Sequence, residues 1–235
     1  MIRYLNLVFF AGMIAMNYLA NALPLNGRTT GELSNATPNL FTPAGVTFSI
    51  WGVIYLLLAG YCVVQLSGRG LQLAVGLGWL FGVSCLLNAL WIVAWHYEKV
   101  PLSLVIMAGL LVTLILINLK LKDRPLGLAK AAFGVYLGWI CIATIANVTT
   151  LLVRTNWNGF GISQEVWAIA MIAVGAVIVS AAIVKLANPF LGLAVVWAFA
   201  GIILKRSQDY LSIVVAAAAG ILIVAVVTVR AFLRR

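Results

Sequence analysis

Charged residues are scarce in this sequence. Of its 235 residues, 9% are charged and 64% are hydrophobic, and only five are Asp or Glu. Soluble domains carry about 25% charged and about 45–50% apolar residues, and a chain of this size cannot bury so large an apolar excess. The composition therefore excludes a water-soluble enzyme and a disordered chain. It predicts an integral membrane protein whose main partner is the lipid bilayer.

Histidine and cysteine are equally rare. The sequence has one histidine, and its three cysteines (Cys62, Cys85 and Cys141) lie in apolar segments without C-x-x-C spacing. This pattern supports neither a disulfide framework nor a metal site. The sequence also offers no catalytic dyad and no glycine-rich nucleotide motif in a suitable context. Enzymatic activity is therefore the least favoured function, and these residues indicate no cofactor.

The net charge of +10 could suggest a nucleic-acid partner. The basic residues, however, stand singly or in short clusters between apolar runs, and they do not form one stripe. This distribution is typical of short loops held on the cytoplasmic side of a membrane. We therefore expect no nucleic-acid partner.

What the sequence has in abundance is long apolar runs. A membrane-spanning helix needs about 20 mostly apolar residues, and runs so uniformly apolar exclude the alternating strands of a barrel. The predicted fold class is an all-α integral membrane protein with about eight transmembrane helices. The eight predicted segments, of which the seventh is the shortest, are 4–23, 45–66, 72–95, 101–119, 128–153, 165–186, 189–204 and 210–232.

The basic residues also predict the topology. With both termini in the cytoplasm, ten Lys and Arg lie inside and five outside, whereas seven spans would move the C-terminal arginines to the other side. The inside set is Arg3, Arg69, Lys120, Lys122, Arg124, Lys130, Lys185, Arg230, Arg234 and Arg235, and the outside set is Arg28, Lys99, Arg154, Lys205 and Arg206.

Two N-terminal features leave alternatives open. The first run, with Arg3 before it and Ala20-Asn21-Ala22 near its end, also resembles a signal peptide; its polar residues Asn17 and Asn21 favour a retained helix. The connection 26–42 is the longest in the chain. Long loops in compact domains often serve as lids or binding loops, and a passive surface loop is the alternative.

Four of the predicted helices carry polar and aromatic residues three or four positions apart, which places them on one helix face. If these faces converge, they enclose a pocket suited to a large, flat, mostly apolar ligand. The alternative is that each Asn joins two helices and each Trp or Tyr lies at the membrane interface, a role we assign to Trp95, Trp157 and Trp167. The four sets are Asn17 and Asn21; Trp51 and Tyr55; Asn88, Trp91 and Trp95; and Tyr136, Trp139, Ala143 and Asn147.

These residues resemble the TspO/MBR family of tryptophan-rich sensory proteins, which are related to the translocator protein (peripheral benzodiazepine receptor). The similar motifs are Pro43-Ala-Gly-Val-Thr-Phe-Ser-Ile-Trp51-Gly-Val-Ile-Tyr55, Asn88-Ala-Leu-Trp91, and Tyr136-Leu-Gly-Trp139 followed by Ala143 and Asn147. The resemblance covers residues 1–160 and implies a five-helix bundle there. Residues 161–235 would form an additional extension of three helices.

The resemblance implies a pocket that binds porphyrins or similar ligands, including haem, with residues 26–42 as its lid. Matching positions for ligand contacts are Trp51, Asn88, Trp139 and Ala143, with Tyr55 and Trp91 nearby; the helix faces add Tyr136 and Asn147. The sequence departs from the family in the segment before Trp51, which lacks the usual additional tryptophan, and at Val135, where a proline is usual.

Three functions follow from these expectations. The favoured one is a membrane receptor or sensor for a flat hydrophobic ligand, in a multi-pass protein of a bacterial cell membrane that could form a homodimer. A secondary transporter of a small apolar metabolite is the main alternative, because eight spans exceed what a five-helix receptor needs. Light-dependent porphyrin breakdown is the third, since the resemblance implicates Trp51 and Trp139 in it.

Overall fold

Helices build almost all of the chain. The computed structural model describes residues 1–23 and 25–234, without the side chain of Arg69. The predicted cytoplasmic positions of the Arg69 side chain and of Arg235 lie outside the described residues. Short 3-10 turns occupy Leu25–Gly27, Gly45–Ser49 and Gly159–Gly161. The α-helices of the described chain are α1 (Ile2–Ala22), α2 (Thr30–Asn35), α3 (Ile50–Val64), α4 (Gly68–Leu77), α5 (Leu80–His96), α6 (Val100–Leu121), α7 (Leu128–Arg154), α8 (Gln164–Leu186), α9 (Phe190–Arg206) and α10 (Leu211–Leu233).

The predicted all-helical membrane fold is confirmed. Within the described residues, six helices are long and apolar enough to cross a membrane, and the bent pair α4–α5 makes a seventh. The six are α1, α3 with its preceding turn, α6, α7, α8 and α10. The remaining predicted segment is α9, which has 17 residues and lies alongside α7 and α10.

One predicted helix is divided. The sequence predicted a single span over 72–95, but the chain bends by 67° between α4 and α5. The bend follows Gly78, whose φ of 60° and ψ of −135° suit a residue without a Cβ atom. The run is apolar on both sides of the break, which is why hydrophobicity alone did not reveal it. As a result, α5 alone carries Asn88, Trp91 and Trp95.

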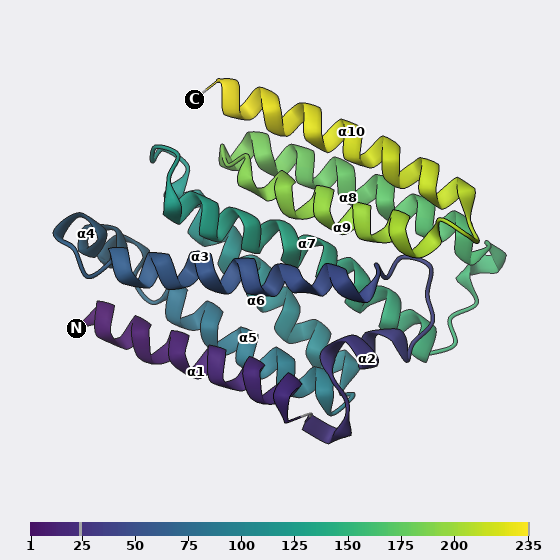
Figure 1. Ribbon diagram of the computed structural model, residues 1–235, viewed down its shortest axis with the longest axis horizontal. Helices are drawn as coiled ribbons and strands as arrows, with labels where there is room; N and C mark the ends of the chain where they lie inside the picture. The colour runs from purple at the N-terminus through teal and green to yellow at the C-terminus, as the bar shows by residue number, and fades with distance from the viewer. Residues whose placement is uncertain (24, 235) are drawn as a thin grey trace.

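Helix α7 lies at the centre of the molecule. It packs against α3 and α6 on one side and against α8 and α9 on the other (Figure 1). The two chain termini lie at the same end of the bundle (Figure 1). The connections that follow α1, α5, α7 and α9 are at the opposite end. This alternation is what a chain that crosses a bilayer repeatedly requires.

Buried contacts join the start of α9 to α6 and α7. At Gly138 of α7, an added Cβ atom would stand 2.2 Å from the carbonyl oxygen of Leu191, so only glycine allows this approach. Asn188, just before α9, donates hydrogen bonds to the Oδ1 atom of Asn118 (2.8 Å) and to the carbonyl of Lys130 (2.9 Å). The predicted division at residue 160 therefore crosses a closely packed interface.

Candidate functional site

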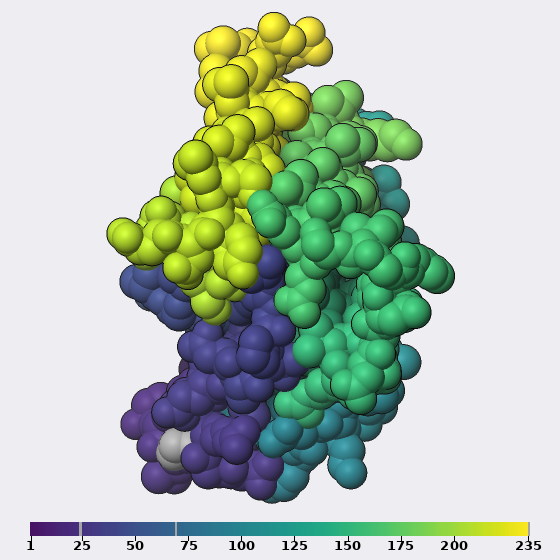
Figure 2. Space-filling view, turned by 90° about the vertical axis from the view of Figure 1, so that its right-hand side faces the viewer, coloured from purple at the N-terminus to yellow at the C-terminus, as the bar shows by residue number. Residues whose placement is uncertain are grey.

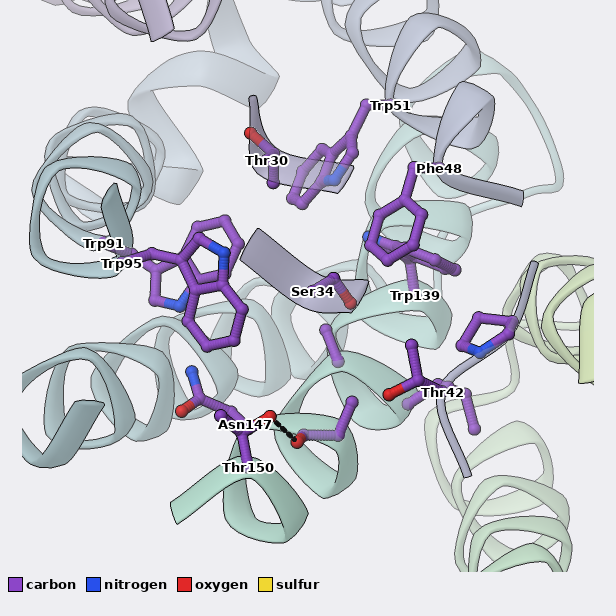
Figure 3. Close-up of a pocket in the computed structure, with 14 residues that line it drawn as sticks. Thr30, Ser34, Thr42, Phe48, Trp51, Trp91, Trp95, Trp139, Asn147 and Thr150 are labelled. Carbon is purple, nitrogen blue, oxygen red and sulfur yellow. Dashed lines mark hydrogen bonds between the residues drawn. The ribbon is translucent and has the colours of Figure 1, made fainter. Parts of the chain in front are cut away.

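A small cavity lies between α3, α5 and α7, beneath the connection from α1 to α3 (Figure 3). Its volume is about 40 Å³. Five of the eight residues predicted for the site line it: Trp51, Trp91, Trp139, Ala143 and Asn147. The helix faces predicted from sequence spacing therefore do converge, although the space between them is small.

Trp51 is the centre of an aromatic cluster at this site. Its ring stacks on Tyr55, one turn further along α3, with centroids 5.6 Å apart and planes at 24°. Trp139 and Tyr136 of α7 approach it edge-on, at 6.2 and 5.9 Å. Trp91 of α5 lies 6.3 Å away. Three helices thus supply flat apolar walls, and rings in these arrangements attract each other.

The other three predicted residues, Tyr55, Asn88 and Tyr136, are not among those that line the cavity. A hydrogen-bond chain accounts for two of them: Asn17 of α1 donates to Asn88 Oδ1 (2.7 Å), and Asn88 donates to the hydroxyl of Tyr136 (2.8 Å). The chain ties α1, α5 and α7 together, which is the joining role left open for Asn88. Tyr55 contacts the site through Trp51, on whose ring it stacks.

Trp95 was assigned to the membrane interface, and that assignment was wrong. The residue is 8% exposed, stacks on Trp91 with centroids 5.9 Å apart, and lines the cavity. Its position seven residues after Asn88 on the same helix face was the signal that could have found it. Phe48, also missed, packs edge-on against Trp139 at 5.8 Å. The remaining lining residues are Thr30, Ser34, Thr42, Pro43, Ile142, Ala146 and Thr150.

Four hydrogen-bond donors in the lining have no partner among the described residues. They are the indole N–H groups of Trp91, Trp95 and Trp139 and the side-chain amide of Asn147. The Oδ1 atom of Asn147 is already engaged, because it accepts from Ser103 (3.2 Å). A buried donor without a partner costs about 1–3 kcal/mol. Four of the lining residues therefore carry a buried donor that a hydrogen-bond acceptor could pair.

The predicted lid, residues 26–42, covers this cavity and contains a helix that the sequence analysis did not expect. Thr30 and Ser34 of this helix, α2, are part of the lining (Figure 3). A capping box starts α2: Thr29 accepts from the Glu32 amide, and the Glu32 carboxylate accepts from the Thr29 amide (2.7 Å). This backbone hydrogen bond, with further contributions from the Thr29 hydroxyl and the nearby Arg28, holds the pKa of Glu32 below its usual range.

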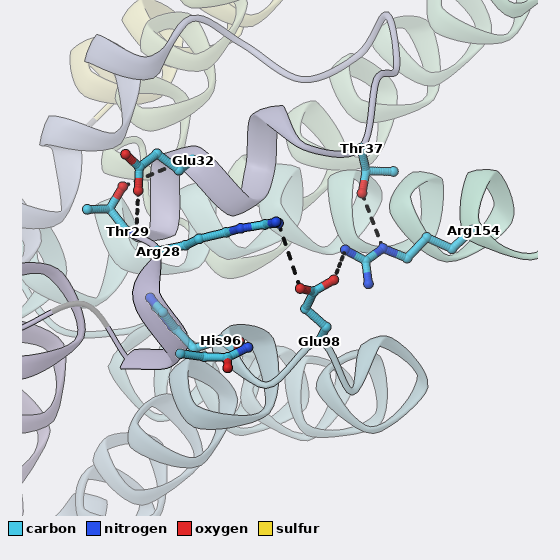
Figure 4. Close-up of polar contacts among 8 residues, drawn as sticks. Arg28, Thr29, Glu32, Thr37, His96, Glu98 and Arg154 are labelled. Carbon is cyan, nitrogen blue, oxygen red and sulfur yellow. Dashed lines mark hydrogen bonds and ion pairs between the residues drawn. The ribbon is translucent and has the colours of Figure 1, made fainter.

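Charged residues fasten the lid to the ends of α5 and α7 (Figure 4). The Glu98 carboxylate lies 2.8 Å from Arg154 and 3.8 Å from Arg28 of the lid. Arg154 also donates to the Thr37 hydroxyl (3.2 Å), which belongs to the lid as well. Beneath these pairs, Asn26 donates to the carbonyl of the buried His96 (3.1 Å). Residues 26–42 are therefore tied to the ends of α5 and α7 in this conformation.

The cavity is small in this conformation. A space of about 40 Å³ holds only a few water molecules, since one water needs about 10–15 Å³ by this measure. Pockets that bind small molecules measure about 300–1,000 Å³. A ligand larger than a few atoms can enter only after the lid and the rings beneath it move.

Comparison with known families gives one match. The model of the family described as TSPO-like protein matches residues 3–230. Comparisons with curated proteins and with solved structures gave no match. The matched region runs from α1 into α10, and it therefore includes the helices beyond residue 160 that the resemblance had left outside.

Proposed function

The chain belongs to the TSPO-like family, and from this premise we propose that it is a membrane receptor or sensor for a flat hydrophobic ligand. The ligand class that fits best is a tetrapyrrole, bound between α3, α5 and α7. The observation that carries this proposal is the combination of flat aromatic walls with four buried donors on the lining residues that have no partner within the described part of the chain.

The chemistry of a tetrapyrrole matches this lining. Its flat faces can stack against indole rings such as those of Trp51 and Trp91. Its carboxylates can accept hydrogen bonds from Trp95, Trp139 and Asn147, and hydrogen bonds to an ionised acceptor are stronger than neutral ones. No lining residue is proposed as a ligand to iron, so haem would be bound through the ring and its carboxylates.

The placement in the membrane is part of the proposal. Both termini lie at one end of the bundle (Figure 1), and the sequence places more Lys and Arg at this end than at the other. We assign this end to the cytoplasm of a bacterial cell, which puts the lid on the outer side. A homodimer stays a prediction, which light scattering on the purified protein can test.

The test compares two porphyrins. Protoporphyrin IX carries two carboxylates, whereas octaethylporphyrin has the same flat ring without them. We expect saturable quenching of tryptophan fluorescence by protoporphyrin IX, weaker binding of octaethylporphyrin, and reduced quenching in Trp139→Phe. Quenching that does not saturate, or that is the same in Trp139→Phe, would refute the proposal.

Two further measurements separate the remaining functions. In proteoliposomes, net movement of protoporphyrin IX across the bilayer would indicate a transporter, whereas binding without movement supports a receptor. Loss of the Soret band in light, dependent on oxygen and on Trp51 or Trp139, would indicate porphyrin breakdown. Neither result is expected from a receptor alone.

A further inference from the structure

One face of α9 holds the last residue of α2 and the segment that follows this helix. Trp197, Gly201 and Lys205 are four residues apart and so share a helix face, and Arg206 adjoins them. Each contacts the segment from Asn35 to Thr47. Figure 2 looks onto this end of the molecule, where the yellow-green end of α9 lies against the blue-purple residues of this segment.

The inner contacts involve the backbone. The indole N–H of Trp197 donates to the carbonyl of Thr47 (2.9 Å), and the Ala44 amide donates to the carbonyl of Gly201 (3.0 Å). A Cβ atom at Gly201 would stand 2.0 Å from the Thr47 hydroxyl oxygen. The absence of a side chain at this position is therefore what lets the segment lie directly on α9.

The outer contacts come from two cations. Lys205 donates to Asn35 Oδ1 (3.0 Å) and to the carbonyl of Pro43 (3.5 Å). Arg206 donates through Nε to the carbonyl of Leu40 (3.2 Å) and through a terminal nitrogen to that of Asn39. Hydrogen bonds from charged donors are stronger than those from neutral ones, and the planar guanidinium suits two acceptors at once.

The segment held in this way separates two spaces. Thr42, Pro43 and Phe48 line the candidate ligand cavity. Asn39, Leu40 and Phe41 line a second hollow of about 590 Å³, which lies between the segment, the end of α7 and the start of α8. A displaced segment would therefore change the wall of the cavity and open it toward the second hollow.

The first half of the lid is held less firmly. Arg28 approaches Glu98 only to 3.8 Å, and the side chains of these two residues are 52% and 36% exposed. Exposed ion pairs contribute little, because water and salt screen them. The Thr30 amide donates to Asn21 Oδ1 at a long 3.3 Å. Movement of α2 breaks this ion pair, two contacts of Thr30 and the hydrogen bond from Lys205 to Asn35. Movement of residues 39–47 breaks five hydrogen bonds to α9, two of them from Arg206.

We propose that α9 is the fixed frame of the cavity wall, and that ligand access occurs through movement of residues 28–34, the part of the lid that makes no hydrogen bond to α9 within the described residues. Trp197, Gly201, Lys205 and Arg206 are then positioning residues: they touch no ligand, but they fix Thr42, Pro43 and Phe48 in the lining. The identity of the ligand rests on the proposed function, whereas the frame itself does not.

Hydrogen–deuterium exchange on the full chain in lipid nanodiscs tests the frame without a ligand. In Arg206→Ala we expect exchange in residues 39–47 to rise about tenfold, because two backbone carbonyls lose a charged donor. In Glu98→Gln we expect exchange to rise in residues 28–35 and to stay unchanged in residues 39–47. The control is Lys185→Ala; Lys185 is exposed at the other end of α8 and makes no side-chain hydrogen bond or ion pair within the described residues.

Binding kinetics with protoporphyrin IX test the route of access. Glu98→Gln should raise the association and dissociation rates together, about threefold or more, and leave Kd within about twofold. Arg206→Ala should raise Kd instead, and Arg206→Lys should restore part of the affinity. A positioning role predicts this split, whereas general destabilisation would weaken binding in both variants.

The outcomes distinguish the two proposals. The proposal that α9 is a fixed frame would be overturned by unchanged exchange in residues 39–47 of Arg206→Ala. It would also be overturned if exchange rose equally in residues 28–35 and 39–47 of either variant. If Arg206→Ala does not fold, Trp197→Phe, which keeps an aromatic ring and removes one hydrogen bond, gives the same reading. If the unmodified protein does not bind protoporphyrin IX, the proposed function fails, and the exchange experiment still decides the frame.

Discussion

The unpaired indole of Trp95 leads to a prediction in which stability and binding respond in opposite ways. In Trp95→Phe, removal of the buried donor relieves a cost of about 1–3 kcal/mol. The smaller ring gives up apolar contacts worth roughly 1–2 kcal/mol. Because the two effects nearly cancel, we expect the midpoint of thermal unfolding to change by less than about 3 °C.

Trp167 provides the matched control, because its indole N–H donates to the carbonyl of Gly159 (3.0 Å). Trp167→Phe loses the same part of a ring but also a hydrogen bond, so its midpoint should fall by about 3–8 °C. A thiol-reactive dye can follow unfolding in both variants, since Cys62 and Cys85 are buried in the folded protein.

Binding should show the reverse order. Loss of one hydrogen bond worth about 0.5–1.5 kcal/mol weakens the binding of protoporphyrin IX to Trp95→Phe by about 2- to 12-fold. Octaethylporphyrin, which has no carboxylate to accept from the indole, should bind the variant and the unmodified protein alike. The reasoning is refuted if Trp95→Phe destabilises the protein as much as Trp167→Phe does and binds protoporphyrin IX normally.

Three further changes test other parts of the structure. Tyr136→Phe leaves the amide of Asn88 without its acceptor, so the free energy of unfolding measured by detergent titration should fall by about 0.6–1.7 kcal/mol; an unchanged value would contradict the hydrogen-bond chain. Gly138→Val should destabilise by at least about 1–3 kcal/mol and lower the yield of monodisperse protein, because its side chain meets the Leu191 carbonyl. Since the folded-state pKa of Glu32 is lowered, the capping box stabilises α2 above the usual glutamate pKa of about 4.3 and is lost as the pH falls through the lowered value. Exchange in α2 should therefore rise in acid, and not in Glu32→Gln.

The sequence predicts most of the helices because membrane spans are specified by length and apolarity, and both can be read directly. The break at Gly78 was missed because the run is apolar on both sides of the glycine. Helix α2 was missed because it has six residues and lies in a polar connection. Its capping box, Thr29-x-x-Glu32, was nevertheless visible in the sequence.

The site was predictable where one helix face specified it. Trp139, Ala143 and Asn147 line the cavity as their spacing suggests. Trp95 shares the predicted face of α5, but it lies near the helix end, where tryptophan is also typical of the membrane interface, and it was left out for that reason. Spacing cannot reveal contacts between distant segments: Trp197 meets Thr47 150 positions away, and no local pattern connects them.

The donors of the cavity lining and the contacts of the lid together set the energetics of binding. Four donors of the lining residues have no partner among the described residues, and buried donors without a partner are costly. The ion pair between Arg28, just before α2, and Glu98 is partly exposed, and such pairs contribute about 0–1 kcal/mol. Opening is therefore inexpensive, and the apparent Kd exceeds the intrinsic one only by the reciprocal of the open fraction. A ligand whose acceptors pair these donors removes this cost, so its acceptors determine affinity more than its contact with the lid.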